Sequence, residues 1–149
     1  MAELPPDLAA EVEALSAEGD GALAAGATAQ AVLRYEAALD LLPEPRHQWS
    51  VACWLWWAIA DARWRGRDFA GALEPLSLAL LHGDPGNALV HLRRGQCLVE
   101  LGHRAEGQDA LARAYAAGGR ALFAREDPRW LAEIADLADI PLPGEDGDE

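Results

Sequence analysis

Apolar residues recur at helical spacing through most of the chain, and short groups rich in glycine and proline interrupt them. We interpret the interruptions at residues 26–28, 43–45, 83–86 and 118–119 as turns. Between the turns, alanine and leucine dominate, which favours helices, whereas the β-branched residues that favour strands are scarce. The pattern predicts an all-α protein built from paired helices.

The two ends of this pattern carry separate helix signals. Asp7 follows two prolines and is expected to cap the first helix. Asp127 as a cap and Pro128 in the first helical position predict a last helix over about residues 128–139. Its apolar side chains at helical spacing are Trp130, Leu131, Ile134 and Leu137. We expect this helix to cover the last open face of the fold, and residues 141–149 to form a disordered acidic tail.

Three segments of the chain align with one another when they are set on their turns. Small residues recur at three positions, and a bulky apolar residue recurs between the last two. The small residues are Gly19, Ala60 and Gly95, then Ala31, Ala72 and Gly107, then Ala38, Ala79 and Ala114, and the bulky ones are Tyr35, Leu76 and Leu111. Helices that approach within about 8–10 Å need a small side chain at their contact, so the recurrence predicts repeated helical hairpins.

These segments resemble the tetratricopeptide repeat, a pair of antiparallel helices of about 34 residues. The resemblance implies a right-handed α-solenoid of about three hairpins and a C-terminal capping helix. The expected hairpins span residues 12–45, 53–86 and 88–121, within a single domain of residues 1–140.

Some residues depart from the repeat pattern. His91 stands where the other two segments have the large apolar residues Leu15 and Trp56. Gly19 and Ala60 are 41 residues apart, whereas Ala60 and Gly95 are 35 apart. The surplus lies around residues 46–51, where we expect a longer connection or an extended helix start. Pro75 is expected to kink the helix that contains it.

A more specific resemblance covers roughly residues 48–135. The residues that carry it are Gly86-Asn87, Leu92-Arg93, Gly95-Gln96, Arg113-Ala114-Tyr115 and Glu126-Asp127-Pro128. They resemble a group of small bacterial tetratricopeptide proteins from the gene neighbourhoods of polymorphic toxins. The resemblance implies a candidate immunity or accessory factor.

Charge narrows the classes of partner. The 12 basic residues are all arginine and the 25 acidic residues give a net charge of −13. Nucleic acids and anionic membranes both require a basic surface, so neither is expected as a partner. Solubility explains much of this acidity equally well. The first residues lack the basic and apolar regions of a secretion signal, and the longest apolar run, residues 51–60, is too short to span a bilayer. We therefore expect a cytoplasmic protein.

No constellation for catalysis or metal binding is found in the sequence. The three serines lack a nucleophile-elbow setting, and the four histidines lack the spacing of a zinc motif. Cys53 and Cys97 lie in apolar helical stretches and are expected to be buried, reduced thiols. We expect neither enzymatic activity, nor a cofactor, nor a metal site, and His91 is expected to be a packed or partly exposed side chain.

The resemblance implies a concave groove lined by the first helix of each hairpin. The implied groove residues are Glu13, Ser16, Asp20 and Leu23, then Trp54, Trp57, Asp61 and Trp64, then Leu89, Leu92, Gln96 and Val99, with Arg93 adjacent. The middle set also follows a single helical stripe, which excludes Trp56 and assigns that ring to the core. Tryptophan is enriched at binding hot spots, although these rings could equally pack against neighbouring helices.

These observations predict a non-catalytic protein-binding module that holds a partner polypeptide in the groove. The aromatic, acidic groove suits an apolar segment that carries Arg or Lys. The tetratricopeptide domains that grip a C-terminal carboxylate use lysines and asparagines at these groove positions. This chain has no lysine, and its single asparagine, Asn87, lies outside the groove positions, so the resemblance does not favour such a clamp. Toxin neutralisation is the most concrete version of this function. The alternative is a self-associating scaffold or secretion-type chaperone whose aromatic face is buried in a homodimer.

Overall fold

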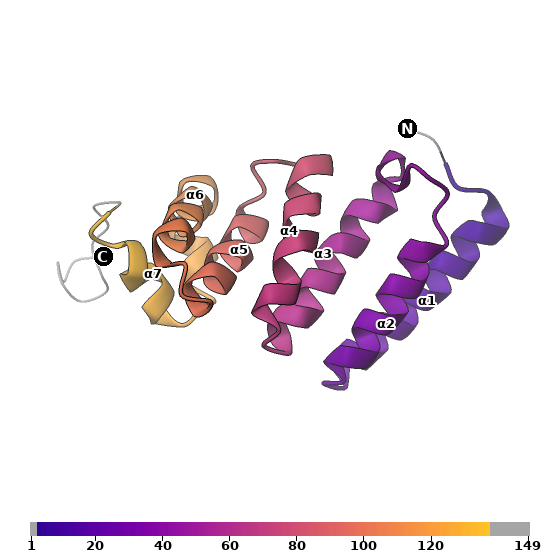
Figure 1. The fold of residues 1–149 in the computed structure, drawn as a ribbon, viewed down its shortest axis with the longest axis horizontal. Coiled ribbons are helices and arrows are strands. Elements are labelled where there is room, and N and C mark those ends of the chain that lie inside the picture. The colour runs from indigo at the N-terminus through magenta and orange to yellow at the C-terminus, as the bar shows by residue number, and fades with distance from the viewer. Residues whose placement is uncertain (1–2, 138–149) are drawn as a thin grey trace. The chain divides into compact units, whose positions relative to one another are not determined.

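The computed structural model describes residues 3–137, which form seven α-helices and one short 3-10 helix (Figure 1). No strand occurs among these residues, which confirms the predicted all-α class. The helices are α1 (Pro6–Ala24), α2 (Thr28–Asp40), η1 (Arg46–Gln48), α3 (Ser50–Arg65), α4 (Phe69–His82), α5 (Ala88–Glu100), α6 (Arg104–Phe123) and α7 (Pro128–Ile134).

The chain divides into two compact units, which we call the N-terminal unit (residues 1–85) and the C-terminal unit (residues 86–149). Helices α1–α4 belong to the first unit and α5–α7 to the second. The single domain of residues 1–140 stays a prediction, and the predicted tail, residues 141–149, lies outside the described residues.

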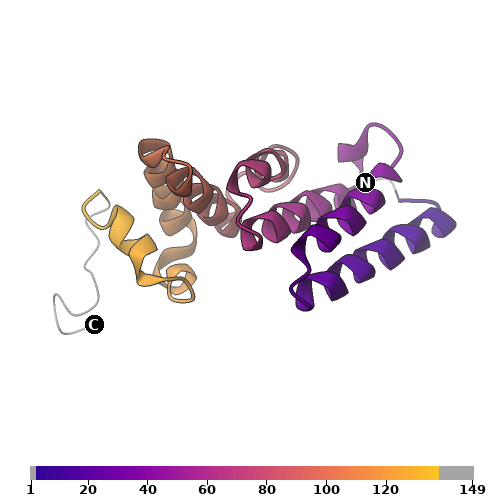
Figure 2. The same cartoon turned by 60° about the horizontal axis from the view of Figure 1, so that its bottom comes forward.

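The N-terminal unit contains two hairpins, α1 with α2 and α3 with α4, and α2 also packs against α3 (Figure 2). Small side chains lie at these contacts, as predicted. Ala31, Ala38 and Ala72 have no exposed surface, and a Cβ atom on Gly19 would lie 2.5 Å from the ring of Tyr35. The close approach of the helices therefore depends on these small residues.

A longer connection follows the first hairpin, as the repeat spacing predicts. Residues 41–49 separate α2 from α3, whereas residues 83–87 separate α4 from α5. The longer connection contains η1, and the Trp49 indole donates a hydrogen bond to the Pro43 carbonyl at 2.8 Å. The connection is thus an ordered turn of its own and does not extend α3.

Side-chain caps begin three of the helices. Asp68 accepts from the Gly71 amide at the start of α4, and Asn87 accepts from the Leu89 and Val90 amides at the start of α5. Asp127 accepts from the Arg129 amide, which confirms the predicted start of α7.

The prediction that Asp7 caps α1 is wrong. Pro5 occupies the cap position and makes no side-chain hydrogen bond, so α1 already begins at Pro6. Proline is well suited to a first helical turn, because its backbone φ is already near the helical value. Asp7 instead lies within that turn, where its carboxylate interacts favourably with the helix dipole.

Helix α4 continues through Pro75, which has no N–H to donate to the carbonyl of Gly71 one turn earlier. The Arg63 guanidinium of α3 replaces that donor, with Nη1 3.0 Å from the Gly71 oxygen. Its Nη2 atom also pairs with Glu36 of α2 at 3.1 Å. One arginine thus connects three helices and satisfies the carbonyl that proline leaves open.

In the C-terminal unit, α5 and α6 form a hairpin that crosses at two glycines. A Cβ atom on Gly95 would lie 2.7 Å from Cγ of Leu111 and 3.0 Å from the carbonyl oxygen of Gly107. Helix α6 is interrupted at Gly119, whose backbone has φ 67° and ψ −166°. The chain then turns into α7, which packs against α6.

The core of this unit joins the hairpin to the segment after Gly119. Its buried members are Leu92, Leu111, Ala114, Phe123, Trp130, Leu131 and Ile134. Leu137 was expected on the same apolar face, but it is 64% exposed because α7 already ends at Ile134. Residues 138 and 139, the end of the predicted capping helix, lie outside the described residues.

Within residues 3–137, none of the helices has the length and apolar character needed to cross a membrane. Neither Cys53 nor Cys97 forms a disulfide. Cys97 is buried as predicted, whereas Cys53 is half-buried and its thiol donates to the Ala79 carbonyl at 3.4 Å. Burial raises the pKa of the Cys53 thiol, which lowers its reactivity as a nucleophile.

Candidate functional site

Helices α1 and α3 of the N-terminal unit border a surface hollow of about 360 Å³. It is lined by Leu4, Ala9, Val12, Glu13, Ser16, Val51 and Trp54. The Ser16 hydroxyl donates to the Val12 carbonyl at 2.8 Å, so its proton is engaged by the backbone of the same helix. The hollow is therefore mainly apolar, with one exposed carboxylate, Glu13, among its lining residues. It brings together three predicted groove residues: Glu13, Ser16 and Trp54.

The tryptophans of α3 differ in exposure. Trp54 is 42% exposed, and its ring meets the Tyr35 ring edge-on with centroids 5.8 Å apart. Trp57 and Trp64 are half-buried. Trp56 is buried, as its position off the stripe predicts. Trp54 therefore presents the largest aromatic surface of the stripe, and it does so beside the hollow.

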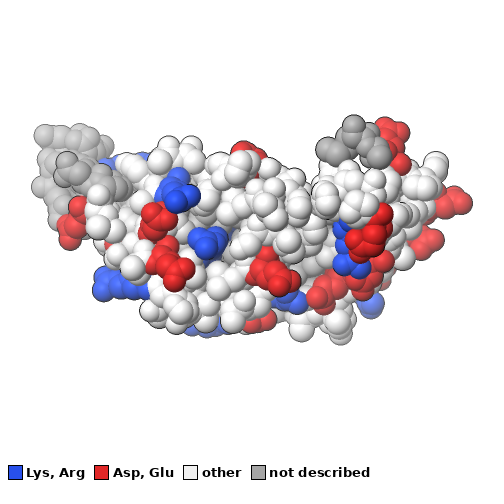
Figure 3. All heavy atoms as spheres, turned by 45° about the horizontal axis from the view of Figure 1, so that its top comes forward, with Lys and Arg blue, Asp and Glu red and all other residues white. Residues whose placement is uncertain are grey.

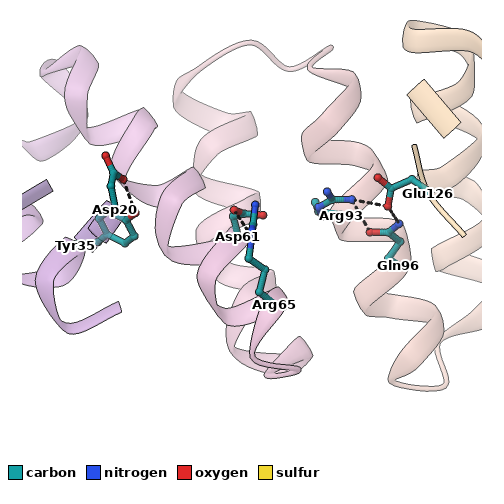
Figure 4. Close-up of polar contacts among 7 residues, drawn as sticks. All are labelled: Asp20, Tyr35, Asp61, Arg65, Arg93, Gln96 and Glu126. Carbon is teal, nitrogen blue, oxygen red and sulfur yellow. Dashed lines mark hydrogen bonds and ion pairs between the residues drawn. The ribbon is translucent and has the colours of Figure 1, made fainter. Parts of the chain in front are cut away.

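The predicted residues Asp20 and Asp61 each take part in a separate polar contact (Figure 4). The Tyr35 hydroxyl donates to Asp20 at 2.6 Å, and Asp61 accepts from Arg65 at 3.0 Å. Burial, then the hydrogen bond to Asp20 and the charges of Asp20 and Asp61, raise the pKa of Tyr35, although Arg65 acts to lower it. The hydroxyl therefore remains a donor at neutral pH and fixes the position of the Asp20 carboxylate.

Tyr35 is a site residue that the sequence interpretation missed. It occupies the bulky apolar position of the repeat, and its side chain is 1% exposed. Its ring also supports Trp54 and its hydroxyl orients Asp20. The signal in the sequence is the Tyr35 hydroxyl, because Leu76 and Leu111 at the same repeat position have no polar group.

The N-terminal unit is strongly acidic. Residues 1–85 hold 13 of the 25 carboxylates and 5 of the 12 arginines. On the face drawn in Figure 3, red carboxylate atoms predominate over this unit. Glu18 is paired with Arg34 at 3.5 Å, whereas Glu13 has no ion pair within residues 3–137. The electrostatic field beside the hollow therefore favours a cation.

The predicted groove residues of the third hairpin differ in exposure: Leu89 is 36% exposed and Val99 is half-buried, whereas the others lie in the interior of the C-terminal unit. Leu92 and Gln96 have no exposed surface, and the Arg93 side chain is 11% exposed. Arg93 donates to Glu126 at 2.9 Å and to Gln96 at 3.0 Å, and Gln96 donates to Glu126 at 2.8 Å (Figure 4). The segment after Gly119, which contains Glu126, covers Leu92 and Gln96. A partner could contact either residue only if that segment moved away. The repeat positions of α5 alone do not reveal this cover.

A stacked histidine pair was also missed. The His47 and His82 rings are 4.5 Å apart and nearly parallel, and the His82 ring lies 5.4 Å from that of Trp56. The two histidines are 35 residues apart, so no local spacing could reveal the contact. Across residues 3–137, no group of three or more His, Cys, Asp or Glu side chains has a metal-binding arrangement.

Comparison with solved structures identifies the fold. The chain is similar to the Arabidopsis OM64 TPR domain, with 19% identity, a TM-score of 0.68, and coverage of 89% of this chain and 98% of that one. It is also similar to the first TPR of Spaghetti (RPAP3) bound to the HSP90 peptide SRMEEVD, with 17% identity, a TM-score of 0.66, and coverage of 87% and 91%. The first TPR domain of human RPAP3 gives 18% identity, a TM-score of 0.64 and the same coverage.

These similarities confirm the predicted tetratricopeptide fold class. At such low identity they establish the fold alone. No protein-family model matches the sequence, and no curated protein matches it.

Proposed function

We propose that the chain is a non-catalytic protein-binding module that holds a segment of a partner polypeptide along α1 and α3. The observation that carries this proposal is the apolar hollow beside the exposed face of Trp54. A hollow of about 360 Å³ accommodates one or two apolar side chains. A rigid aromatic ring next to a pocket is the usual composition of a binding hot spot.

The carboxylates of α1, of which Glu13 lines the hollow, determine the chemistry of the partner. Glu13 is exposed, and Asp20 is held in place by Tyr35. An Arg or Lys of the partner would neutralise these carboxylates, whereas an acidic segment would be repelled. The partner segment is therefore basic and apolar. The peptide bound to the Spaghetti domain carries three acidic residues and one basic residue, which is the opposite preference.

A selection from a random-peptide display library tests this function. The baits are the wild-type protein, a hollow variant, Trp54→Ser, and a control variant, Leu81→Ser. Leu81 is a 73% exposed apolar residue of α4 that does not line the hollow. We expect wild type and control to enrich peptides with a bulky apolar residue near Arg or Lys, and Trp54→Ser to lose them. Enrichment of acidic peptides, or equal enrichment by all three baits, would contradict the proposal.

Within this function, we propose neutralisation of a basic toxin domain as the most specific role. The acidity of the N-terminal unit supports it, because a nuclease that binds nucleic acid has a basic surface. If a toxin domain is encoded beside this gene, co-production of this chain with that toxin should restore growth, and Glu13→Arg should weaken that rescue. Absence of any rescue by the folded wild-type protein would exclude immunity but not the binding module.

A further inference from the structure

The segment that follows Gly119 is joined to α6 through a single residue. The Gly119 backbone, at φ 67° and ψ −166°, lies in a region that is essentially restricted to glycine. The residues on both sides of it are helical, so α6 would run straight on if Gly119 became helical. A change at one residue is therefore sufficient to swing residues 120–137 away from the hairpin.

This segment covers an apolar surface on the hairpin that is formed by α5 and by the part of α6 before Gly119. It contributes Phe123, Trp130 and Ile134, which are 4%, 5% and 0% exposed. The hairpin contributes Leu92 and Leu111, which have no exposed surface. Neither side can be left uncovered in water without a large hydrophobic cost.

Charged pairs define how the segment docks. The Glu126 carboxylate accepts from Arg93 and Gln96, and the Arg93 and Glu126 side chains are 11% and 12% exposed. Two further pairs lie nearer the surface: Glu133 with Arg104 at 2.7 Å, and Arg129 with Glu100 at 2.8 Å. These three pairs fix the orientation in which the segment docks.

We propose that residues 120–137 are an exchangeable element and that a second copy of this chain can supply them. With Gly119 helical, the segment of each copy docks on the α5–α6 hairpin of the other, and both copies regain the same core and the same Arg93–Glu126 pair. Because the contacts are identical, the monomer and the exchanged dimer differ in free energy only through the conformation of Gly119 and the entropy of association. The residues involved all belong to the C-terminal unit, so the inference is independent of the α1–α3 hollow.

Charge reversal distinguishes exchange from any other association. Arg93→Glu and Glu126→Arg each place like charges in the buried pair. Mixed together, the two variants can form an exchanged heterodimer in which both pairs are again oppositely charged. Native mass spectrometry should show a 1:1 dimer at about twice 15.9 kDa in the mixture and not in either variant alone. A mixture in which the variants remain separate, folded or not, would overturn the proposal.

A backbone substitution provides the second test. Gly119→Ala penalises the kinked joint and favours the straight helix, so the dimer fraction measured by light scattering should rise several-fold over wild type. Gly102→Ala is the matched control, since Gly102 also has a positive φ of 88° and open surroundings but lies in the α5–α6 turn. A monomeric Gly119→Ala, or equal dimer fractions for both variants, would count against exchange. A dimer that also requires Trp54 would indicate association through the aromatic face instead.

Discussion

At Gly95, where α5 crosses α6, an added Cβ atom would lie 2.7 Å from Leu111 and 3.0 Å from a backbone oxygen. Gly95→Ala should therefore destabilise the protein by about 1–3 kcal/mol, because the helices must move apart. Gly21, inside α1, has no atom within 4 Å of the added carbon. There, Gly21→Ala should stabilise by about 0.5–1 kcal/mol, because alanine restricts the unfolded chain. Urea unfolding of both variants measures the difference, and effects of the same sign would contradict the close crossing.

Glu133 provides a pH-dependent contribution to stability. Burial alone would raise its pKa, but hydrogen bonds from Arg104 and Gln108 and the charges of Arg104 and Arg129 outweigh it and lower the pKa below 4.5. Because the folded-state pKa is the lower one, this stabilisation is complete above pH 4.5 and is lost as the pH falls through the folded-state value.

Glu133→Gln should accordingly cost about 0.5–1 kcal/mol at neutral pH, because the exposed Arg104 limits the strength of the pair. The difference from wild type should vanish in acid, where the wild-type carboxyl is also neutral. Thermal unfolding of both proteins across the acidic range measures this. A difference that persists or grows at low pH would show that Glu133 acts through packing and not through charge.

At the scale of one element, α4 depends on a side chain from α3. Arg63 donates to the Gly71 carbonyl that Pro75 cannot serve, so Arg63→Met should cost about 1–3 kcal/mol. In a Pro75→Ala background the alanine N–H can serve that carbonyl, and the same Arg63→Met change should cost less. A double-mutant cycle by chemical unfolding measures the coupling. Additivity within about 0.5 kcal/mol would mean that the two residues act independently.

The elements themselves were largely predictable, because each helix carries local signals. Recurring small residues such as Ala31 and Ala72 marked the crossings, and Asp127 marked the start of α7. Errors arose where the local signal had two interpretations. Asp7 is a good cap residue, but the preceding proline is an equally good helix start. Leu137 continues the helical spacing, but α7 ends three residues before it.

The candidate site was less predictable than the helices, because it depends on contacts between residues far apart in sequence. The α1–α3 hollow brings together Glu13 and Trp54, which the repeat positions had assigned to a groove. On α5, Gln96 is buried against Glu126, which lies 30 residues away in sequence, and no local pattern links the two residues. A charged pair at that separation becomes visible only when the path of the chain is known.

For the molecule as a whole, the two units contain similar helical hairpins that differ in which side chains are exposed. The N-terminal unit leaves Trp54 and its hollow accessible, whereas the C-terminal unit covers Leu92 and Gln96 with its own chain. Recognition of a partner is therefore expected from the N-terminal unit alone. Variants confined to the C-terminal core, such as Gly95→Ala, should change stability without changing the partner sequence that is selected.

Docking of a basic, apolar polypeptide in the α1–α3 hollow can be observed residue by residue in solution. The most direct measurement is an NMR titration of the ¹⁵N-labelled protein with the peptide most enriched in the display selection. We expect the largest shifts at the amides of Val12 and Ser16 and at the Trp54 indole, and a loss of these shifts in Trp54→Ser. Shifts centred on α5–α7, or none at saturating peptide, would contradict it.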